Sequence, residues 1–186
     1  MKTHSFPTRA LCLCALFTAL IAVGAFLRIP LPLIPFTLQT LFIMLAGLLL
    51  GKKWGTVSCV VYVLLGLLGL PIFTQGGGIG YVLKPTFGYL LGFSFGAWTI
   101  GALAKKGASY LRMLLASFAG LAVIYLFGTV YFYLLSTFYL NKAVAIWPML
   151  VSCVLTTLPG DILLALGASF LALRLRPHLR LENIKK

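Results

Sequence analysis

Long apolar runs, separated by short segments that carry almost all of the basic residues, constrain this chain more than any other feature. Only 9% of the 186 residues are charged, against about a quarter in a soluble domain. So few charges cannot cover a water-facing surface, and we expect a single integral membrane domain over residues 1–186. The runs lack the alternating pattern of barrel strands, so they predict an all-α polytopic membrane protein. Six runs can be drawn, at residues 10–27, 36–50, 54–70, 85–104, 111–140 and 144–173.

The basic residues predict the topology. Six crossings with both termini in the cytoplasm leave only Arg28, Lys84 and Lys142 on the outside. This is a strong positive-inside bias. Because the cations sit in short clusters between apolar runs, the net charge of +13 does not indicate nucleic-acid binding. The twelve predicted cytoplasmic cations are Lys2, Arg9, Lys52, Lys53, Lys105, Lys106, Arg112, Arg174, Arg176, Arg180, Lys185 and Lys186.

The first run also has features of a secretory signal peptide, because the basic flank "MKTHSFPTR" precedes it. However, its apolar stretch is long for a signal peptide, and the segment that follows, "RIPLPLIP", has no small-residue cleavage site. We therefore interpret this run as a retained first helix.

No catalytic or metal-binding set is visible. The only histidines, His4 and His178, lie in the tails, and the four cysteines fall in or beside apolar runs. Cysteines in such surroundings behave as small hydrophobes, so we expect neither a disulfide nor a metal site. An integral membrane enzyme would need a second acid, a histidine or a metal set. There is also no Walker A motif, so any coupling to ATP must come from partner proteins.

One carboxylate stands inside a hydrophobic segment. Asp161, in "TTLPGDILLAL", is one of two acidic residues, and the other, Glu182, lies in the basic tail. An acid within a membrane segment costs about 2.5 to 3.5 kcal/mol and is usually functional. Asp161 could accept hydrogen bonds from a polar ligand, or form a structural ion pair with Arg28 or Lys84. A proton-relay role is weaker, because the spans contain no histidine or glutamate partner.

Two regions at the predicted outer end carry binding-type side chains. The glycine-rich loop "PIFTQGGGIGYVLKPT", residues 71–86, is long enough either to fold over a ligand or to act as a flexible linker. Thr37 and Gln39 stand where the second helix is expected to begin. They either contact a ligand or cap free backbone N–H groups.

Small residues recur every fourth position in the first run, at Ala15, Ala19 and Val23. This spacing places them on one stripe of a helix, and small residues let membrane helices approach closely. The stripe predicts either packing within the chain or docking to another membrane protein.

Three blocks together resemble a known family. They are "IPLPLIPFTLQTLFIMLAGLLLG", "PIFTQGGGIGYVLKPTFGYLLGF" and "LPGD", and they resemble the BioY family, the biotin-binding S-components of energy-coupling factor transporters. The resemblance implies a six-helix protein of the cell membrane that binds biotin near its outer face. It also implies a membrane T-component and two cytoplasmic ATPases as partners, and no cofactor. An S-component for another vitamin and a structural membrane protein are the alternatives.

The resemblance transfers to individual residues with two departures. Asp161 matches the family's biotin-contacting aspartate, and an ionised carboxylate suits the two N–H donors of the ureido ring. The family continues P-G-D-x-x-K, but Leu164 stands in place of the lysine. "KPTFGY" replaces "GPTGGY", so we infer that Lys84 or Arg28 meets the ligand carboxylate. The Ala15, Ala19 and Val23 stripe resembles the family's docking surface. The candidates that line the apolar ring of the ligand are Phe36, Tyr81 and Tyr89.

Overall fold

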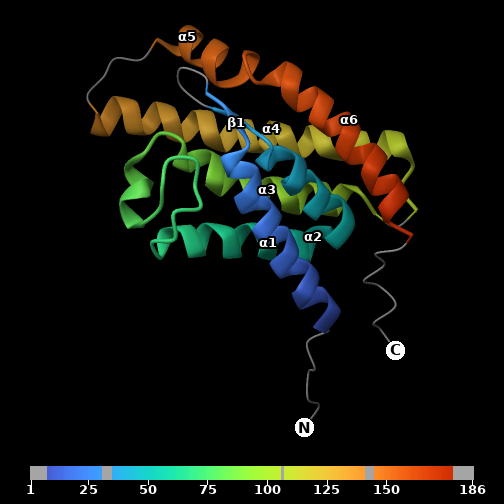
Figure 1. Cartoon of the computed structure of the whole chain (residues 1–186). Helices are drawn as coiled ribbons and strands as arrows, with labels where there is room; N and C mark the ends of the chain where they lie inside the picture. The colour runs from blue at the N-terminus through green and yellow to red at the C-terminus, as the bar shows by residue number, and fades with distance from the viewer. Residues whose placement is uncertain (1–7, 31–34, 106, 141–144, 178–186) are drawn as a thin grey trace.

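The structure of the protein is a computed structural model that describes residues 8–30, 35–105, 107–140 and 145–177. It is a bundle of helices with one short strand pair (Figure 1). The α-helices are α1 (Thr8–Phe26), α2 (Gln39–Leu67), α3 (Phe87–Leu103), α4 (Tyr110–Leu134), α5 (Ile146–Leu150) and α6 (Leu158–Leu175). Between them lie a 3-10 helix, η1 (Ile79–Leu83), and two π-helical turns, η2 (Leu135–Tyr139) and η3 (Val151–Leu155).

The expected helical fold has one local exception after the first helix. Strand β1 (Arg28–Ile29) pairs antiparallel with β2 (Phe36–Thr37). The register places Arg28 opposite Thr37 and Ile29 opposite Phe36. The proline-rich "RIPLPLIP" cannot continue a helix, since proline lacks the backbone donor and clashes in a helix interior.

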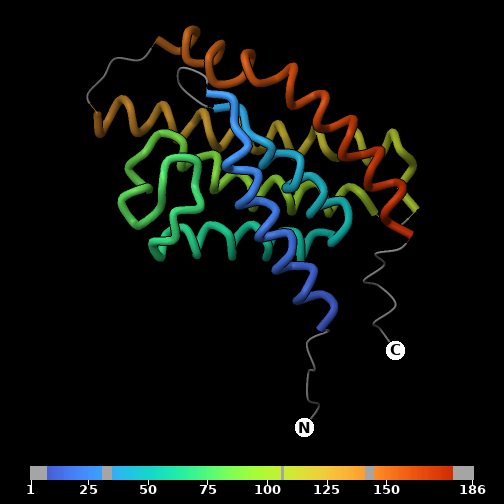
Figure 2. Tube along the Cα trace, viewed as in Figure 1, coloured from blue at the N-terminus to red at the C-terminus, as the bar shows by residue number. Residues whose placement is uncertain are grey.

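Helix α2 reverses direction at Gly51. This residue has φ 76° and ψ −178°, a conformation open mainly to glycine. The two arms, residues 39–50 and 52–67, lie side by side (Figure 2). A Cβ atom added to Gly55 would lie 2.8 Å from the carbonyl oxygen of Ala46 on the other arm. The second and third apolar runs of the sequence therefore correspond to these two arms.

The described residues contain four helical segments that are long and apolar enough to cross a membrane. By length and composition they are Thr8–Phe26, Gln39–Leu67 with both arms of α2 counted together, Tyr110–Tyr139 and Ile146–Leu175, and the apolar helix α3 is shorter. The bundle surface carries many large apolar side chains, for example Leu163 at 69% exposure and Leu111 at 62%. Such a surface is suited to lipid, so the chain is an integral membrane protein.

The interior is formed where α2 packs against α1, α3 and α6, α3 packs against α4, and α4 packs against α6. Small residues make these contacts close: Ala97, Ala165, Ala168 and Ala172 are completely buried. Close approach of small residues is the usual way for membrane helices to associate, because lipid provides no hydrophobic driving force between them.

Basic residues from separate predicted cytoplasmic segments meet at one end of the bundle. A Cβ on Gly101 would lie 2.2 Å from the backbone nitrogen of Lys52. Arg112 Nε donates to the Leu103 carbonyl at 3.1 Å, and Arg176 Nη2 donates to the Ala104 carbonyl at 2.5 Å. Figure 1 shows this end on the right, where α2 reverses, α3 connects to α4 and α6 ends, and the loop before α3 on the left.

Candidate functional site

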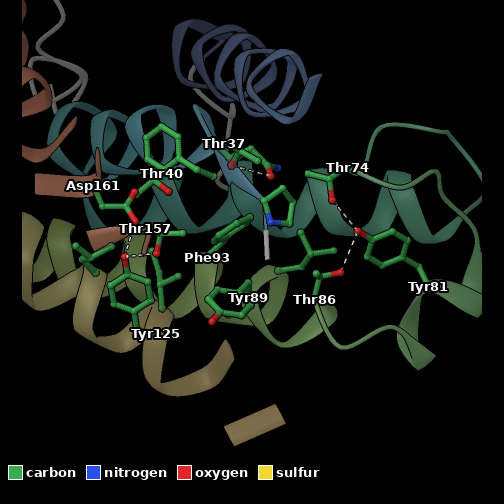
Figure 3. Close-up of a pocket in the computed structure, with 16 residues that line it drawn as sticks. Thr37, Thr40, Thr74, Tyr81, Thr86, Tyr89, Phe93, Tyr125, Thr157 and Asp161 are labelled. Atoms are coloured by element: carbon green, nitrogen blue, oxygen red, sulfur yellow. Dashed lines mark hydrogen bonds between the residues drawn. The ribbon is translucent and has the colours of Figure 1, made fainter. Parts of the chain in front are cut away.

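A cavity of about 60 Å³ lies beside strand β2, among α2, α3, α4, α6 and the loop at residues 71–86 (Figure 3). Its wall combines aromatic rings, aliphatic side chains and hydroxyl groups with one carboxylate. This is the usual composition of a small-molecule site, in which apolar lining provides contact area and a few polar groups fix orientation. The lining residues are Pro35, Phe36, Thr37, Gln39, Thr40, Thr74, Tyr81, Thr86, Tyr89, Leu90, Phe93, Leu121, Ile124, Tyr125, Thr157 and Asp161.

Six of the eight ligand-binding residues predicted from the sequence line this one cavity: Phe36, Thr37, Gln39, Tyr81, Tyr89 and Asp161. The two predicted cations, Arg28 and Lys84, do not line it. Lys84 Nζ donates to the Gln75 carbonyl at 2.8 Å, and Arg28 donates to the Thr74 carbonyl. Among the described residues Asp161 forms no ion pair, so the alternative of a structural pair with Arg28 or Lys84 is not what the structure shows.

Asp161 occupies the first turn of α6 and is only 4% exposed. A helix begins here because Pro159 is tolerated at the first helical positions, and the helix N-terminus favours a negative charge. Tyr125 donates to Asp161 Oδ2 at 2.5 Å, and the Thr157 hydroxyl lies 3.0 Å from the Tyr125 hydroxyl. Oδ1 is buried and makes no hydrogen bond of good geometry within the described part of the chain, although the Thr40 side chain lies beside the carboxylate.

A buried acceptor without a donor is unfavourable, and each such atom in a folded protein calls for an explanation. Figure 3 shows the Asp161 carboxyl group in the cavity wall next to Thr40, with Tyr125 and Thr157 on its other side. The carboxylate is thus held in place through one oxygen, while the other remains available to a donor that enters the cavity.

Gln39 connects the start of α2 to the loop. Its Nε2 donates to the Tyr62 hydroxyl at 2.8 Å, and that hydroxyl donates to the Ile72 carbonyl at 3.0 Å. Thr37 Oγ1 lies 3.5 Å from Gln39 Oε1. The structure shows no side-chain cap at the start of α2, so the capping role considered for Thr37 is not observed.

The loop at residues 71–86 has its own packed core. Phe73, 1% exposed, packs against Tyr81 and Tyr62 with ring centroids 4.6 and 5.4 Å apart. The Tyr81 hydroxyl lies 3.0 Å from Thr74 Oγ1 and 3.2 Å from Thr86 Oγ1. These contacts favour a folded cover for the cavity over a flexible linker.

Side chains from outside and within the loop hold it by its backbone. Four carbonyl oxygens accept such hydrogen bonds: Ile72 from Tyr62, Thr74 from Arg28, Gln75 from Lys84 and Val82 from Tyr131. We call the four side chains that donate these hydrogen bonds, those of Arg28, Tyr62, Lys84 and Tyr131, the loop anchors. Lys84 Nζ also lies 4.9 Å from the centre of the Tyr81 ring, in cation–π geometry.

Two aromatic rings of the wall depend on glycines opposite them. A Cβ on Gly160 would lie 2.5 Å from the Phe36 ring, and one on Gly128 would lie 2.4 Å from the Tyr89 ring. Gly160 in "LPGD" therefore lets β2 approach the start of α6. The Tyr89 hydroxyl donates to the Cys153 carbonyl at 3.2 Å, so this residue offers its ring to the cavity while its hydroxyl group is already bonded to η3.

Thr74, one of the binding-type side chains noted in the glycine-rich loop, also lines the cavity, whereas the sequence interpretation missed four other polar residues of the wall: Thr40, Thr86, Tyr125 and Thr157. Thr157 stands in the stretch that drew attention to Asp161. Tyr125 lies in the apolar run "LAVIYLF", where the sequence does not distinguish an aromatic residue of a binding site from one that packs in the core. Leu164, which replaces the lysine expected from the family pattern, is half-buried and does not line the cavity.

The predicted docking stripe lies on the outer face of α1. Ala15, Ala19 and Val23 are all exposed, Val23 at 51%. The stripe is thus not buried by packing within the chain, and its small residues would let another helix pack closely against it. Among the described residues no group of three histidine, cysteine, aspartate or glutamate side chains could hold a metal ion.

Fold and cavity together define a helical integral membrane protein with a buried, polar-ended ligand cavity. The sequence model of the BioY family matches residues 1–181, and the chain belongs to this family. A probable biotin transporter BioY from Lysinibacillus sphaericus is 44% identical over 170 residues, covering 90% of this chain and 87% of the relative.

Two further comparisons agree. The biotin transporter BioY of Thermotoga maritima is 49% identical over 121 residues, which cover 64% of this chain and 72% of the relative. The crystal structure of the S-component for biotin from an ECF-type ABC transporter superposes with a TM-score of 0.79 at 28% identity. That match covers 95% of both chains.

Proposed function

We propose that this chain is the biotin-binding S-component of an energy-coupling factor transporter in the cytoplasmic membrane, a substrate-binding subunit and not an enzyme. The observation that supports this best is Asp161 Oδ1, a buried acceptor without a partner among the described residues, in the wall of a cavity. The ureido ring of biotin carries two N–H donors, and hydrogen bonds to an ionised acceptor are about twice as strong as neutral ones.

The remaining wall suits the rest of the ligand. In our proposal the thioether ring packs against Phe36, Tyr89 and Phe93, whose rings supply apolar contact area. The valerate chain then runs toward the loop, where Arg28 and Lys84 are the cations nearest in sequence to lining residues. Both cations are bonded to loop carbonyls, so either can meet the ligand carboxylate while keeping the loop in place.

The same proposal includes six crossings with both termini in the cytoplasm. The support is that Lys52, Arg112 and Arg176, from three predicted cytoplasmic segments, lie at one end of the bundle. The exposed stripe of Ala15, Ala19 and Val23 is the proposed contact with a membrane T-component. Two cytoplasmic ATPases would supply ATP hydrolysis, because the chain has no Walker A motif.

Ligand identity is tested on the purified full chain. Native mass spectrometry would detect a co-purified ligand, and calorimetry of the ligand-free protein would measure affinity for biotin, thiamine, riboflavin and folate. We expect biotin to bind and the other three vitamins not to bind. Tight binding of one of the others in place of biotin would overturn the ligand while leaving the class of protein intact.

Topology is tested with reporter fusions near residues 52, 78, 106 and 142. We expect them to alternate between inside, outside, inside and outside. An active outside reporter near residue 106 would contradict six crossings.

Docking is tested by replacing a small residue of the stripe. Ala19→Trp should reduce capture of the T-component and leave biotin affinity unchanged, because the added ring holds the partner helix away. Leu115→Trp is the matched control, since Leu115 is 59% exposed on α4, away from the stripe. Normal capture by Ala19→Trp would contradict this docking surface.

A further inference from the structure

A second hollow lies on the lipid-facing side of the bundle, between the 52–67 arm of α2 and α3. It is an apolar groove of about 510 Å³ and shares no residue with the ligand cavity. Its wall contains no charged side chain, and several members are strongly exposed, including Leu64 at 54% and Trp98 at 52%. The lining residues are Thr56, Val60, Val63, Leu64, Leu91, Ser94, Phe95 and Trp98.

The length of the groove matches one leaflet of a bilayer. On α2 it extends from Thr56 to Leu64, which at 1.5 Å per residue is about 12 Å. Half of the hydrocarbon core of a bilayer is about 15 Å. A single acyl chain that lies along the helix therefore fits the direction and the depth of this groove.

One mouth of the groove is basic. Lys52 and Lys53 are exposed one turn before Thr56, whose hydroxyl donates to the Lys52 carbonyl at 2.6 Å. The end of α3 lies against the same turn, because a Cβ on Gly101 would be 2.2 Å from the Lys52 nitrogen. Lys105, which follows α3, is also exposed. Cations thus gather where the apolar wall ends. Trp98 lines the groove three residues before Gly101 on α3, and tryptophan is enriched at membrane interfaces.

We propose that this groove binds one anionic phospholipid, with an acyl chain along α2 and α3 and the phosphate at Lys52 and Lys53. An apolar groove that ends in two lysines is complementary to a molecule with an apolar tail and an anionic head, and juxtamembrane cations attract anionic lipid. A second protein helix fits less well, because its close approach needs small residues and this wall presents Val60, Leu64, Leu91, Phe95 and Trp98. The proposal does not depend on the identity of the vitamin.

The test uses tryptophan fluorescence in vesicles. A protein that keeps Trp98 alone, with Trp54→Phe and Trp147→Phe, is reconstituted in phosphatidylcholine. A small fraction of lipid with brominated acyl chains is added, either phosphatidylglycerol or phosphatidylcholine. We expect brominated phosphatidylglycerol to quench Trp98 with about tenfold higher apparent affinity. A protein that keeps Trp147 alone, which is 73% exposed at the start of α5, should respond equally to both lipids.

Charge variants complete the test. Lys52→Gln with Lys53→Gln should abolish the preference of Trp98 for phosphatidylglycerol. Arg174→Gln, which removes a cation from the end of α6, should preserve it. Native mass spectrometry of the otherwise unaltered chain provides a second readout, with phosphatidylglycerol retained by the wild type and lost from the double variant. Equal quenching by both lipids, or equal effects of the lysine and arginine variants, would overturn the proposal. Absence of quenching by either lipid would also do so, because it would mean that protein covers the groove.

Discussion

The two polar ends of the ligand cavity differ in charge and in how their groups are satisfied. At the helical end, α4 and α6 hold a carboxylate that keeps one oxygen without a partner among the described residues. At the loop end, the Tyr81 hydroxyl lies within hydrogen-bond distance of the hydroxyls of Thr74 and Thr86. An unsatisfied buried group gains the most from a ligand, whereas a satisfied group gains little. Affinity should therefore come from the helical end, and the loop end should mainly enclose the ligand.

The largest effect should follow from a change at the helical end. Asp161→Asn keeps the shape of the side chain, removes its charge and places an NH₂ donor where ligand donors would point. A hydrogen bond to a charged group contributes about 1.5 to 3 kcal/mol, so we expect biotin affinity to fall about ten- to one-hundred-fold by calorimetry.

The control for Asp161→Asn is Ser117→Ala, which changes another buried polar residue outside the cavity. It should leave affinity unchanged, and melting curves should show both variants folded. Wild-type affinity in Asp161→Asn would remove the ligand role of this carboxylate and, with it, the proposed difference between the two ends.

A smaller effect should follow from removing the group that orients the carboxylate. Tyr125→Phe deletes the donor to Asp161 Oδ2, so the carboxylate loses its fixed orientation, and we expect about a tenfold loss of affinity. Tyr89→Phe is the same chemical change on the same wall, but its hydroxyl is bonded to the Cys153 carbonyl outside the site. Calorimetry should show a clearly smaller loss of affinity for Tyr89→Phe. Equal losses would mean that ring packing, not orientation of Asp161, is what Tyr125 provides.

The smallest effect should come from the loop end. Lys84→Gln removes a cation that is bonded to the Gln75 carbonyl. Solvent-exposed ion pairs contribute about 0.2 to 1 kcal/mol, so biotin affinity should fall by no more than about fivefold. The loss should disappear when biotin methyl ester replaces biotin, because the ester has no carboxylate for the lysine to meet. An equal loss with acid and ester would show that Lys84 serves only to hold the loop.

Much of the helical bundle can be predicted from the sequence, because a backbone that crosses lipid must satisfy its own hydrogen bonds. Apolar runs in a bilayer must be helices, and Lys52 and Lys53 between the second and third runs indicate the reversal between residues 50 and 54. The boundaries at prolines were less predictable. Pro159 lies inside the sixth apolar run of the sequence, residues 144–173, but in the structure it stands in the first turn of α6, after the π-helical turn η3. The strand pair at Arg28 and Phe36 could not be predicted, because its strands of two residues are too short to show the apolar–polar alternation of a β-strand.

The sequence points to part of the cavity wall. Asp161 stands out because a carboxylate in lipid is costly, and Thr37 and Gln39 stand out because they lie at the expected start of the second helix. Tyr125 was not predicted, since its role depends on the hydroxyl of one helix reaching the carboxylate of another, 36 residues away. Arg28 and Lys84 were expected at the ligand, but their bonds to loop carbonyls depend on the fold of the loop.

The loop anchors have a consequence for how the cover of the site can change over time. Every loop anchor donates a hydrogen bond to a main-chain carbonyl oxygen, at Ile72, Thr74, Gln75 or Val82. Such an oxygen is present whichever residue occupies the loop position. The exposed side chain at position 75 can therefore be exchanged while the hydrogen bond from Lys84 persists, whereas Ile72 and Val82 also pack against the core. Thr74 combines both properties, because its carbonyl is bonded to Arg28 while its side chain lines the cavity. A ligand contact at this position can therefore be selected or engineered without losing the hydrogen bond that holds the loop.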